Sequence, residues 1–231
     1  MLAVLPKELV ETGNISQETL IMIIMLPVIA TILGFVRHII GIKSLGLYAP
    51  IILTYAYLEL GLSSSDTTWE GKALYGLKYG LILTIIVFII SYITNAITRR
   101  IRLHYFPKIA LVLSTVALTI YLLMVAANAF NKFGLLNIGF LPVILISTVS
   151  EQFVSLMSKK NIATAISLAI TTVTMSAGIF IITIFEPFQD ILIDYPYLLL
   201  LTIILNILIG RFTGLRASEY IRFKDILDRH D

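Results

Sequence analysis

Two glutamates in otherwise apolar stretches are the residues of this chain whose chemistry most needs an explanation. Glu59 follows Pro50 by nine residues, and Glu151 follows Pro142 by the same interval. A charged carboxylate within hydrocarbon costs about 3 kcal/mol, so such a residue usually faces a partner or a water-filled cavity. The spacing therefore predicts that both glutamates lie on a polar path through the protein.

Paired glycines stand before each proline. Gly41 and Gly46 precede the first proline, Gly134 and Gly139 precede the second, and both prolines lead into Ile-Leu-containing apolar segments. Glycine permits backbone conformations closed to other residues, and proline fits the first turn of a helix. We therefore interpret each stretch as a tight or re-entrant loop followed by a helix that begins near the proline. Such a helix start presents free N–H groups to an anion or carbonyl.

Simpler explanations of these features stay open. Glycine and proline are common in membrane helices, where a break often serves packing or a kink. Glu59 lies just before Gly61, and Glu151 lies eight residues before Lys159, so either carboxylate also fits a helix end at the water interface. If they are buried, Arg37 and Arg211 are the expected counter-charges.

The elements that position these residues are predicted to be membrane helices. The chain is 58% hydrophobic and 13% charged with a mean hydropathy of +0.95, whereas soluble domains carry about 25% charged residues. Seven apolar spans are long enough to cross about 30 Å of hydrocarbon. They are 18–38, 45–62, 75–98, 108–130, 138–157, 161–185 and 191–211. The fold class is therefore an all-α integral membrane protein, which we expect in the inner (cytoplasmic) cell membrane.

The basic residues predict the orientation of these spans. Of the 17 Lys and Arg residues, the connections on one side and the tail from Arg211 hold 13, and the other side holds four. Positive charge favours the cytoplasmic side, which places the N-terminus outside and the C-terminus in the cytoplasm. No detachable signal peptide is expected in the first sixteen residues.

The two motifs also predict an internal repeat. The prolines and the glutamates both recur after 92 residues, an interval that holds three spans. An odd number of spans inverts the second copy in the bilayer, as in many transporters. We expect one membrane domain over 1–231, with repeats at 18–98 and 108–185 and a seventh helix at 191–211. The cytoplasmic tail at 212–231 is expected to lie along the membrane surface.

Several function classes lack support in the sequence. There are no cysteines, the three histidines have no metal-ligand spacing, and neither a phosphate loop nor a nucleophile–base pair is present. The basic residues are distributed between apolar spans, which argues against nucleic-acid binding. We therefore expect a non-enzymatic protein without cofactor or metal, although an intramembrane enzyme remains a minor alternative.

The motifs resemble those of a known family. Four stretches are similar to the bacterial seven-helix membrane domain usually fused to an inactive transglutaminase-like domain. They are Arg37-His-Ile-Ile-Gly41 through Pro50, Leu58-Glu59-Leu-Gly61, Ser150-Glu151-Gln-Phe153 and Gly210-Arg211-Phe-Thr-Gly214 through Glu219. A weaker similarity, carried by the two Gly–Pro motifs, is to the small membrane subunit of poly-γ-glutamate capsule synthesis. Both families are associated with ATP-grasp ligases that make peptide-like products.

The resemblance implies a membrane component of a peptide or polyamide synthesis or export system. In the leading hypothesis the chain binds or passes an anionic, peptide-like substrate between its repeats, with Gly46, Pro50, Gly139 and Pro142 shaping two half-sites. In the alternative it is a structural subunit or scaffold of a larger complex with no path of its own, and the repeat interface is packed by apolar side chains. The expected partners are membrane lipid, an ATP-grasp-type ligase, other membrane subunits or a second copy of the chain.

Overall fold

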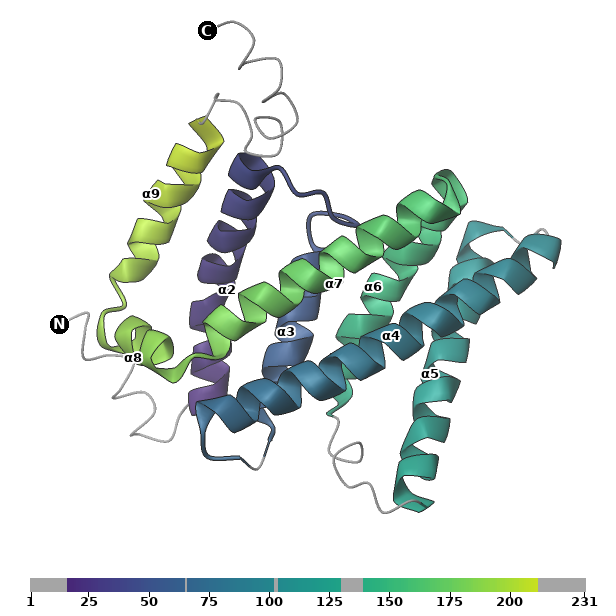
Figure 1. Ribbon diagram of the computed structural model, residues 1–231, viewed down its shortest axis with the longest axis horizontal. Helices are drawn as coiled ribbons and strands as arrows, with labels where there is room; N and C mark the ends of the chain where they lie inside the picture. Colours follow the sequence, from purple (N-terminus) through teal and green to yellow (C-terminus); the bar gives the residue numbers. More distant parts are fainter. Residues whose placement is uncertain (1–15, 65, 102–103, 130–138, 212–231) are drawn as a thin grey trace, which may run out of the picture. The chain divides into compact units, whose positions relative to one another are not determined.

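The computed structural model describes residues 16–64, 66–101, 104–129 and 139–211, and these residues form helices and connections without a strand. The helices belong to two compact units (Figure 1). One unit runs from Ser44 to Ile184, and the other combines the segments up to Lys43 and from Phe185. Gly46 and Pro50 of the first motif and Gly139 and Pro142 of the second therefore lie in the first of these units, whereas Gly41 belongs to the other.

The described residues of the larger unit form five helices. They are α3 (Ala49–Leu62), α4 (Trp69–Ile101), α5 (Tyr105–Ala129), α6 (Phe140–Lys159) and α7 (Ile162–Ile184). α3 packs against α4, α6 and α7, and α5 packs against α4 and α6. α3 and α6 run in opposite directions, as do the long helices α4 and α7 (Figure 1). The helix that carries the first motif is thus enclosed by three others.

Two glycines of α4 allow α3 to approach closely. A Cβ atom at Gly80 would lie 2.4 Å from Cδ1 of Tyr57, and one at Gly76 would lie 2.7 Å from the Tyr57 carbonyl oxygen. The Tyr57 side chain is fully buried, and its hydroxyl shares a 3.1 Å hydrogen bond with the Thr84 hydroxyl. Small residues four positions apart are typical of close helix packing in membranes.

α5 buries only one narrow stripe of its surface. Val112, Val116 and Ile120 recur every four residues on that stripe and are buried, while much of the rest of the helix is exposed. The Thr94 and Thr115 hydroxyls share a 3.0 Å hydrogen bond between α4 and α5. Exposed apolar surface on a long apolar helix is expected where lipid surrounds it.

The smaller unit begins with α2 (Gln17–Phe35), which starts at the cap residue Ser16 and continues as a π-helical turn, η1 (Val36–Ile40). The Ser16 hydroxyl accepts a hydrogen bond from the Thr19 N–H. Gly41 ends the helix with φ 86°, a left-handed conformation that favours glycine. The first glycine of the first motif is therefore a helix stop.

The same unit contains α8 (Glu186–Asp194) and α9 (Leu198–Arg211), which are bent by 103°. Asn206 of α9 donates a 2.9 Å hydrogen bond to the Thr31 hydroxyl of α2. The continuous span predicted over 191–211 is therefore interrupted. Pro196 has no N–H and disfavours a helical conformation at Tyr195, which has φ −125° and ψ 68°.

The structure confirms an all-helical chain with several apolar, span-length helices. Among the described residues, five helices are long and apolar enough to cross a membrane, and the bent α8–α9 pair makes up to six. α3 is apolar but has only 14 residues, roughly 21 Å of helix against about 30 Å of hydrocarbon. The seventh span, the inverted repeats, the single domain and the orientation stay predictions.

Candidate functional site

Both motifs begin a helix, as the sequence predicts. α3 begins at Ala49 with Pro50 as its second residue, and α6 begins at Phe140 with Pro142 as its third. Gly139 caps α6 in an extended conformation with φ −65° and ψ 162°. Proline therefore lies in the first turn of both helices, while the residue before the helix differs, Tyr48 before α3 and Gly139 before α6.

Hydroxyl groups of α7 bind the backbone around the start of α3. The Leu45 N–H donates to the Thr172 hydroxyl at 2.8 Å, and the Ser176 hydroxyl donates to the Pro50 carbonyl at 3.1 Å. The Thr54 hydroxyl donates to the same carbonyl at 2.8 Å. These three hydroxyl side chains are fully buried. The polar backbone at the first motif is therefore bound within the chain itself.

Gly46 lies against α6. A Cβ atom at this position would meet Oε1 of Gln152 at 2.9 Å. Gln152 and its neighbour Glu151 are half-buried, twelve and eleven residues beyond the start of α6. The structure thus brings the first motif together with the segment that carries the second glutamate, which the sequence predicts as part of one site.

Exposed side chains precede the proline in both motifs, Leu47 and Tyr48 in the first and Phe140 and Leu141 in the second. Gly139 is half-buried, Phe140 is 78% exposed, and a Cβ atom at Gly139 would meet only the ring of Pro142, at 3.6 Å. Pro142 itself is buried. Gly134, the first glycine of this motif, lies outside the described residues.

The remaining predicted site residues are more widely distributed. Glu59 is half-buried in the last turn of α3, between the fully buried Leu58 and Leu60. Arg37 lies in η1 and Arg211 is the exposed last residue of α9, so both belong to the smaller unit. Their pairing with the glutamates stays a prediction.

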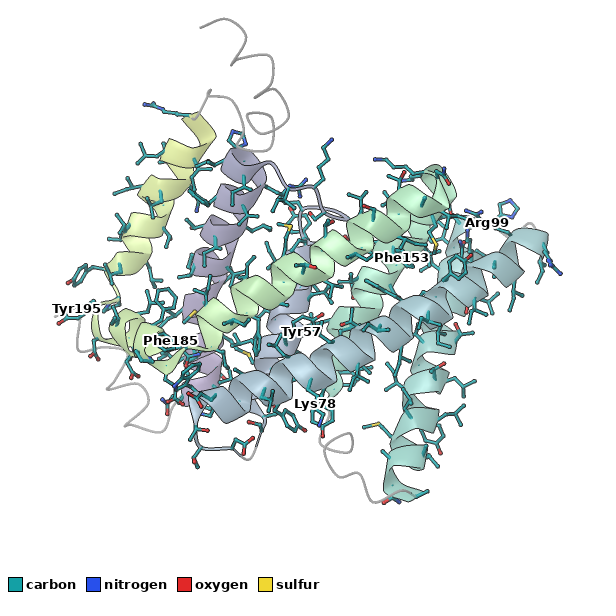
Figure 2. The ribbon with its side chains drawn as sticks, in the orientation of Figure 1. Tyr57, Lys78, Arg99, Phe153, Phe185 and Tyr195 are labelled. Carbon is teal, nitrogen blue, oxygen red and sulfur yellow. The ribbon has the colours of Figure 1, made fainter. Side chains whose placement is uncertain are left out.

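The buried faces of α3 and α6 are mostly apolar. Fully buried apolar side chains include Leu53, Ala56, Tyr57, Leu58 and Leu60 of α3 and Ile146, Val149 and Met157 of α6, and the hydroxyl side chains of Thr54 and Ser150 are fully buried with them. Figure 2 shows Tyr57 of α3 in the interior and Phe153 of α6 beside α7. Phe153 stacks on Phe88 of α4 with ring centroids 4.9 Å apart. Apolar side chains therefore make up most of the fully buried surface of α3 and α6.

Sequence reasoning missed the residues that hold the first motif in place. The pair Gly76 and Gly80 is a Gly-x3-Gly signal within a predicted span, and it was available from the sequence. Thr172 and Ser176 are four residues apart on one face of α7, a weaker signal because hydroxyls in membrane helices often bind only their own helix. Their partners lie more than 120 residues away.

No group of three His, Asp or Glu side chains that could hold a metal ion is found among the residues that the structure describes. Two open apolar hollows occur among the same residues, one lined by α4, α6 and α7 and one by α2 and α9 with η1. Neither is lined by Glu59 or Glu151.

Comparison with known proteins identifies one family. Residues 9–227 match the model of a family described as seven transmembrane helices usually fused to an inactive transglutaminase. No curated protein and no solved structure matches the chain. The weaker similarity to the capsule-synthesis subunit stays a prediction.

Proposed function

Because the chain belongs to the family of seven transmembrane helices usually fused to an inactive transglutaminase, we propose that it is a non-catalytic scaffold subunit of a membrane complex. The complex would make or export a peptide-like polymer, as the resemblance to families associated with ATP-grasp ligases implies. The chain would hold a ligase or another membrane subunit at the bilayer and carry no substrate path of its own.

The observation that carries this proposal is the enclosure of α3. Leu53, Ala56 and Leu60 are fully buried by the neighbouring helices. The Leu45 N–H and the Pro50 carbonyl, which would face a substrate in a half-site, bind Thr172 and Ser176. A buried hydrogen-bonded backbone group is costly to release, so this arrangement favours a fixed structural role.

A specific observation favours a substrate path as the second candidate. Polar side chains gather around the start of α3, with Gln152 against Gly46 and two hydroxyls of α7 nearby. Glu151 is half-buried next to Gln152. A substrate carbonyl that displaced these hydroxyls would find a polar entry at this end of α3, although apolar packing lies beyond it.

A functional comparison of two variants separates the candidates. The tagged chain is purified from its own cells in mild detergent, co-purifying subunits are identified by mass spectrometry, and cellular polymer is quantified. For a scaffold, the double variant Glu59→Ala/Glu151→Ala retains an ATP-grasp-type ligase and normal polymer, whereas Gly80→Leu, which displaces Tyr57 of α3, loses both. Loss of polymer in the glutamate variant with the complex intact would establish the path instead.

A further inference from the structure

An apolar groove crosses the outer surface of the larger unit. It has a volume of about 530 Å³ and is lined by side chains of α4, α6 and α7. Its walls include Ile85 and Tyr92 of α4 and Ile166 and Ile170 of α7, which are 41–61% exposed, and Phe153 of α6 is buried within it. From Ile85 to Tyr92 the groove follows roughly 10 Å of helix.

A cluster of cations lies beyond one end of this groove. Arg99 of α4 donates a hydrogen bond to the Met157 carbonyl of α6, and Lys108 of α5 donates to the Ser158 hydroxyl at 2.7 Å. These bonds draw the ends of α4, α5 and α6 together. The basic end, as we call it, consists of Arg99, Arg100, Lys108, Lys159 and Lys160.

No carboxylate of the neighbouring chain segments balances this charge. Residues 96–109 and 152–165 contain no Asp or Glu. Arg100, Lys159 and Lys160 are exposed, so they are available to an anion from outside the chain. Tyr92 lies seven residues before Arg99, and Ile166 follows Lys160 by six, so the groove ends roughly 10 Å from the cations. Figure 2 shows Phe153 and Arg99 toward this same end of α4 and α6.

We propose that the groove and the basic end together bind one anionic phospholipid, with an acyl chain in the groove and the phosphate at the cations. Basic pockets between membrane helices on the cytoplasmic side are suited to anionic headgroups, and the basic residues predict that side for this end. The groove is lined by large Ile, Phe and Tyr side chains rather than by the small residues that let a second helix approach closely. A flexible acyl chain fits such a surface better than a partner helix.

Brominated lipids test this proposal directly. The chain has one tryptophan, Trp69, so Trp69→Phe gives a background variant without tryptophan fluorescence. Tyr92→Trp then places a fluorophore in the groove, and Ile93→Trp places one at the same depth outside the lining residues. Each variant is placed in nanodiscs that contain brominated phosphatidylglycerol or brominated phosphatidylcholine at equal mole fraction, and quenching gives the ratio of the two binding constants.

We expect phosphatidylglycerol to be preferred at Tyr92→Trp and not at Ile93→Trp. The double substitution Lys159→Gln/Lys160→Gln should reduce this preference by roughly fivefold for each cation removed, since each is worth about 1 kcal/mol near a membrane surface. Neither lysine is buried, so the variant should fold, which the unchanged melting temperature would verify. Equal selectivity at the two tryptophans would mean ordinary surrounding lipid and would overturn the proposal. Absence of quenching by either lipid at Tyr92→Trp would show a protein occupant and would also overturn it.

Discussion

The two Gly–Pro motifs carry matching residues at matching spacing but lie in different surroundings. At the first, Ala49 and Pro50 are buried and the adjoining backbone binds hydroxyls of α7. Exposed side chains precede the proline at both motifs, but among the described residues a Cβ atom at Gly139 would meet only its own Pro142. Sequence therefore determines where each helix begins, while the neighbouring helices determine whether that beginning is accessible.

This difference follows from the positions of the two helices. α3 lies between α4, α6 and α7 and is buried on most sides, whereas α6 is exposed at its first turn. A short helix of 14 residues, enclosed in this way, is stabilised by its neighbours and not by lipid. The first motif is accordingly expected to be the more sensitive of the two to substitution.

The largest expected effect is at the contact that brings α4 against α3. Gly80→Val should lower the free energy of unfolding by about 3 kcal/mol, because even a Cβ atom would lie 2.4 Å from the Tyr57 ring. Gly178→Val in α7 is the control, since nothing lies within 4 Å of a Cβ atom there, and it should change stability by less than about 0.5 kcal/mol. Reversible unfolding in mixed micelles, followed by circular dichroism, measures both. Equal stability of the two variants would mean that α3 and α4 are not packed as described.

An intermediate effect is expected at the hydroxyl that binds the loop before α3. Thr172→Val removes the acceptor of the Leu45 N–H and should cost about 2 kcal/mol, because it leaves a buried donor unsatisfied. Thr148→Val on α6 removes an exposed hydroxyl that bonds only the Ile144 carbonyl of its own helix, and should cost less than about 0.5 kcal/mol. The same unfolding measurement compares them. If Thr148→Val lowered the free energy of unfolding as much as Thr172→Val, the hydrogen bond between Thr172 and Leu45 would not stabilise the first motif as described.

The smallest expected effect comes from the two motif glycines themselves. Gly46→Ala should cost about 1 kcal/mol, since the new methyl group meets the movable end of Gln152. Gly139→Ala should cost about 0.5 kcal/mol, because alanine is a poorer helix N-cap than glycine. The double variant Gly46→Ala/Gln152→Ala should recover most of the loss, which a double-mutant cycle on unfolding free energies would show. Additive losses would indicate that Gly46 is required for its backbone conformation and not for space beside Gln152.

Much of the helical layout is predictable from sequence, but the interior is not. Hydropathy locates the apolar segments, and proline positions predict the starts of α3 and α6. The break before α9 was missed because Pro196 stands within a run of apolar residues that reads as one span. The hydrogen bonds that the Thr172 hydroxyl accepts from Leu45 and that the Ser176 hydroxyl donates to Pro50 connect residues over 120 positions apart, which a local pattern cannot reveal.

The candidate site was predicted only in part. The sequence predicts two half-sites, at Gly46/Pro50 and Gly139/Pro142, and this site stays a prediction; the position of Gly46 beside Gln152 of α6 was not foreseen. The enclosure of α3 by α4, α6 and α7 was not expected, because the sequence gives no sign of which helices surround it. The same apolar residue types contact lipid and pack between helices, so composition alone does not distinguish a lipid-facing surface from a buried one.

Cysteine accessibility tests the central claim, the apolar packing between α3 and α6, most directly. The chain has no cysteine, so Ala56→Cys in α3, Val149→Cys in α6 and the exposed control Thr67→Cys each introduce a single thiol. The variants are treated with a charged, water-soluble maleimide in permeabilised membranes, and again after unfolding in detergent to count the thiols. We predict that only Thr67→Cys is modified before unfolding. Modification of Ala56→Cys and Val149→Cys at the rate of Thr67→Cys would reveal a water-filled path and contradict the scaffold account.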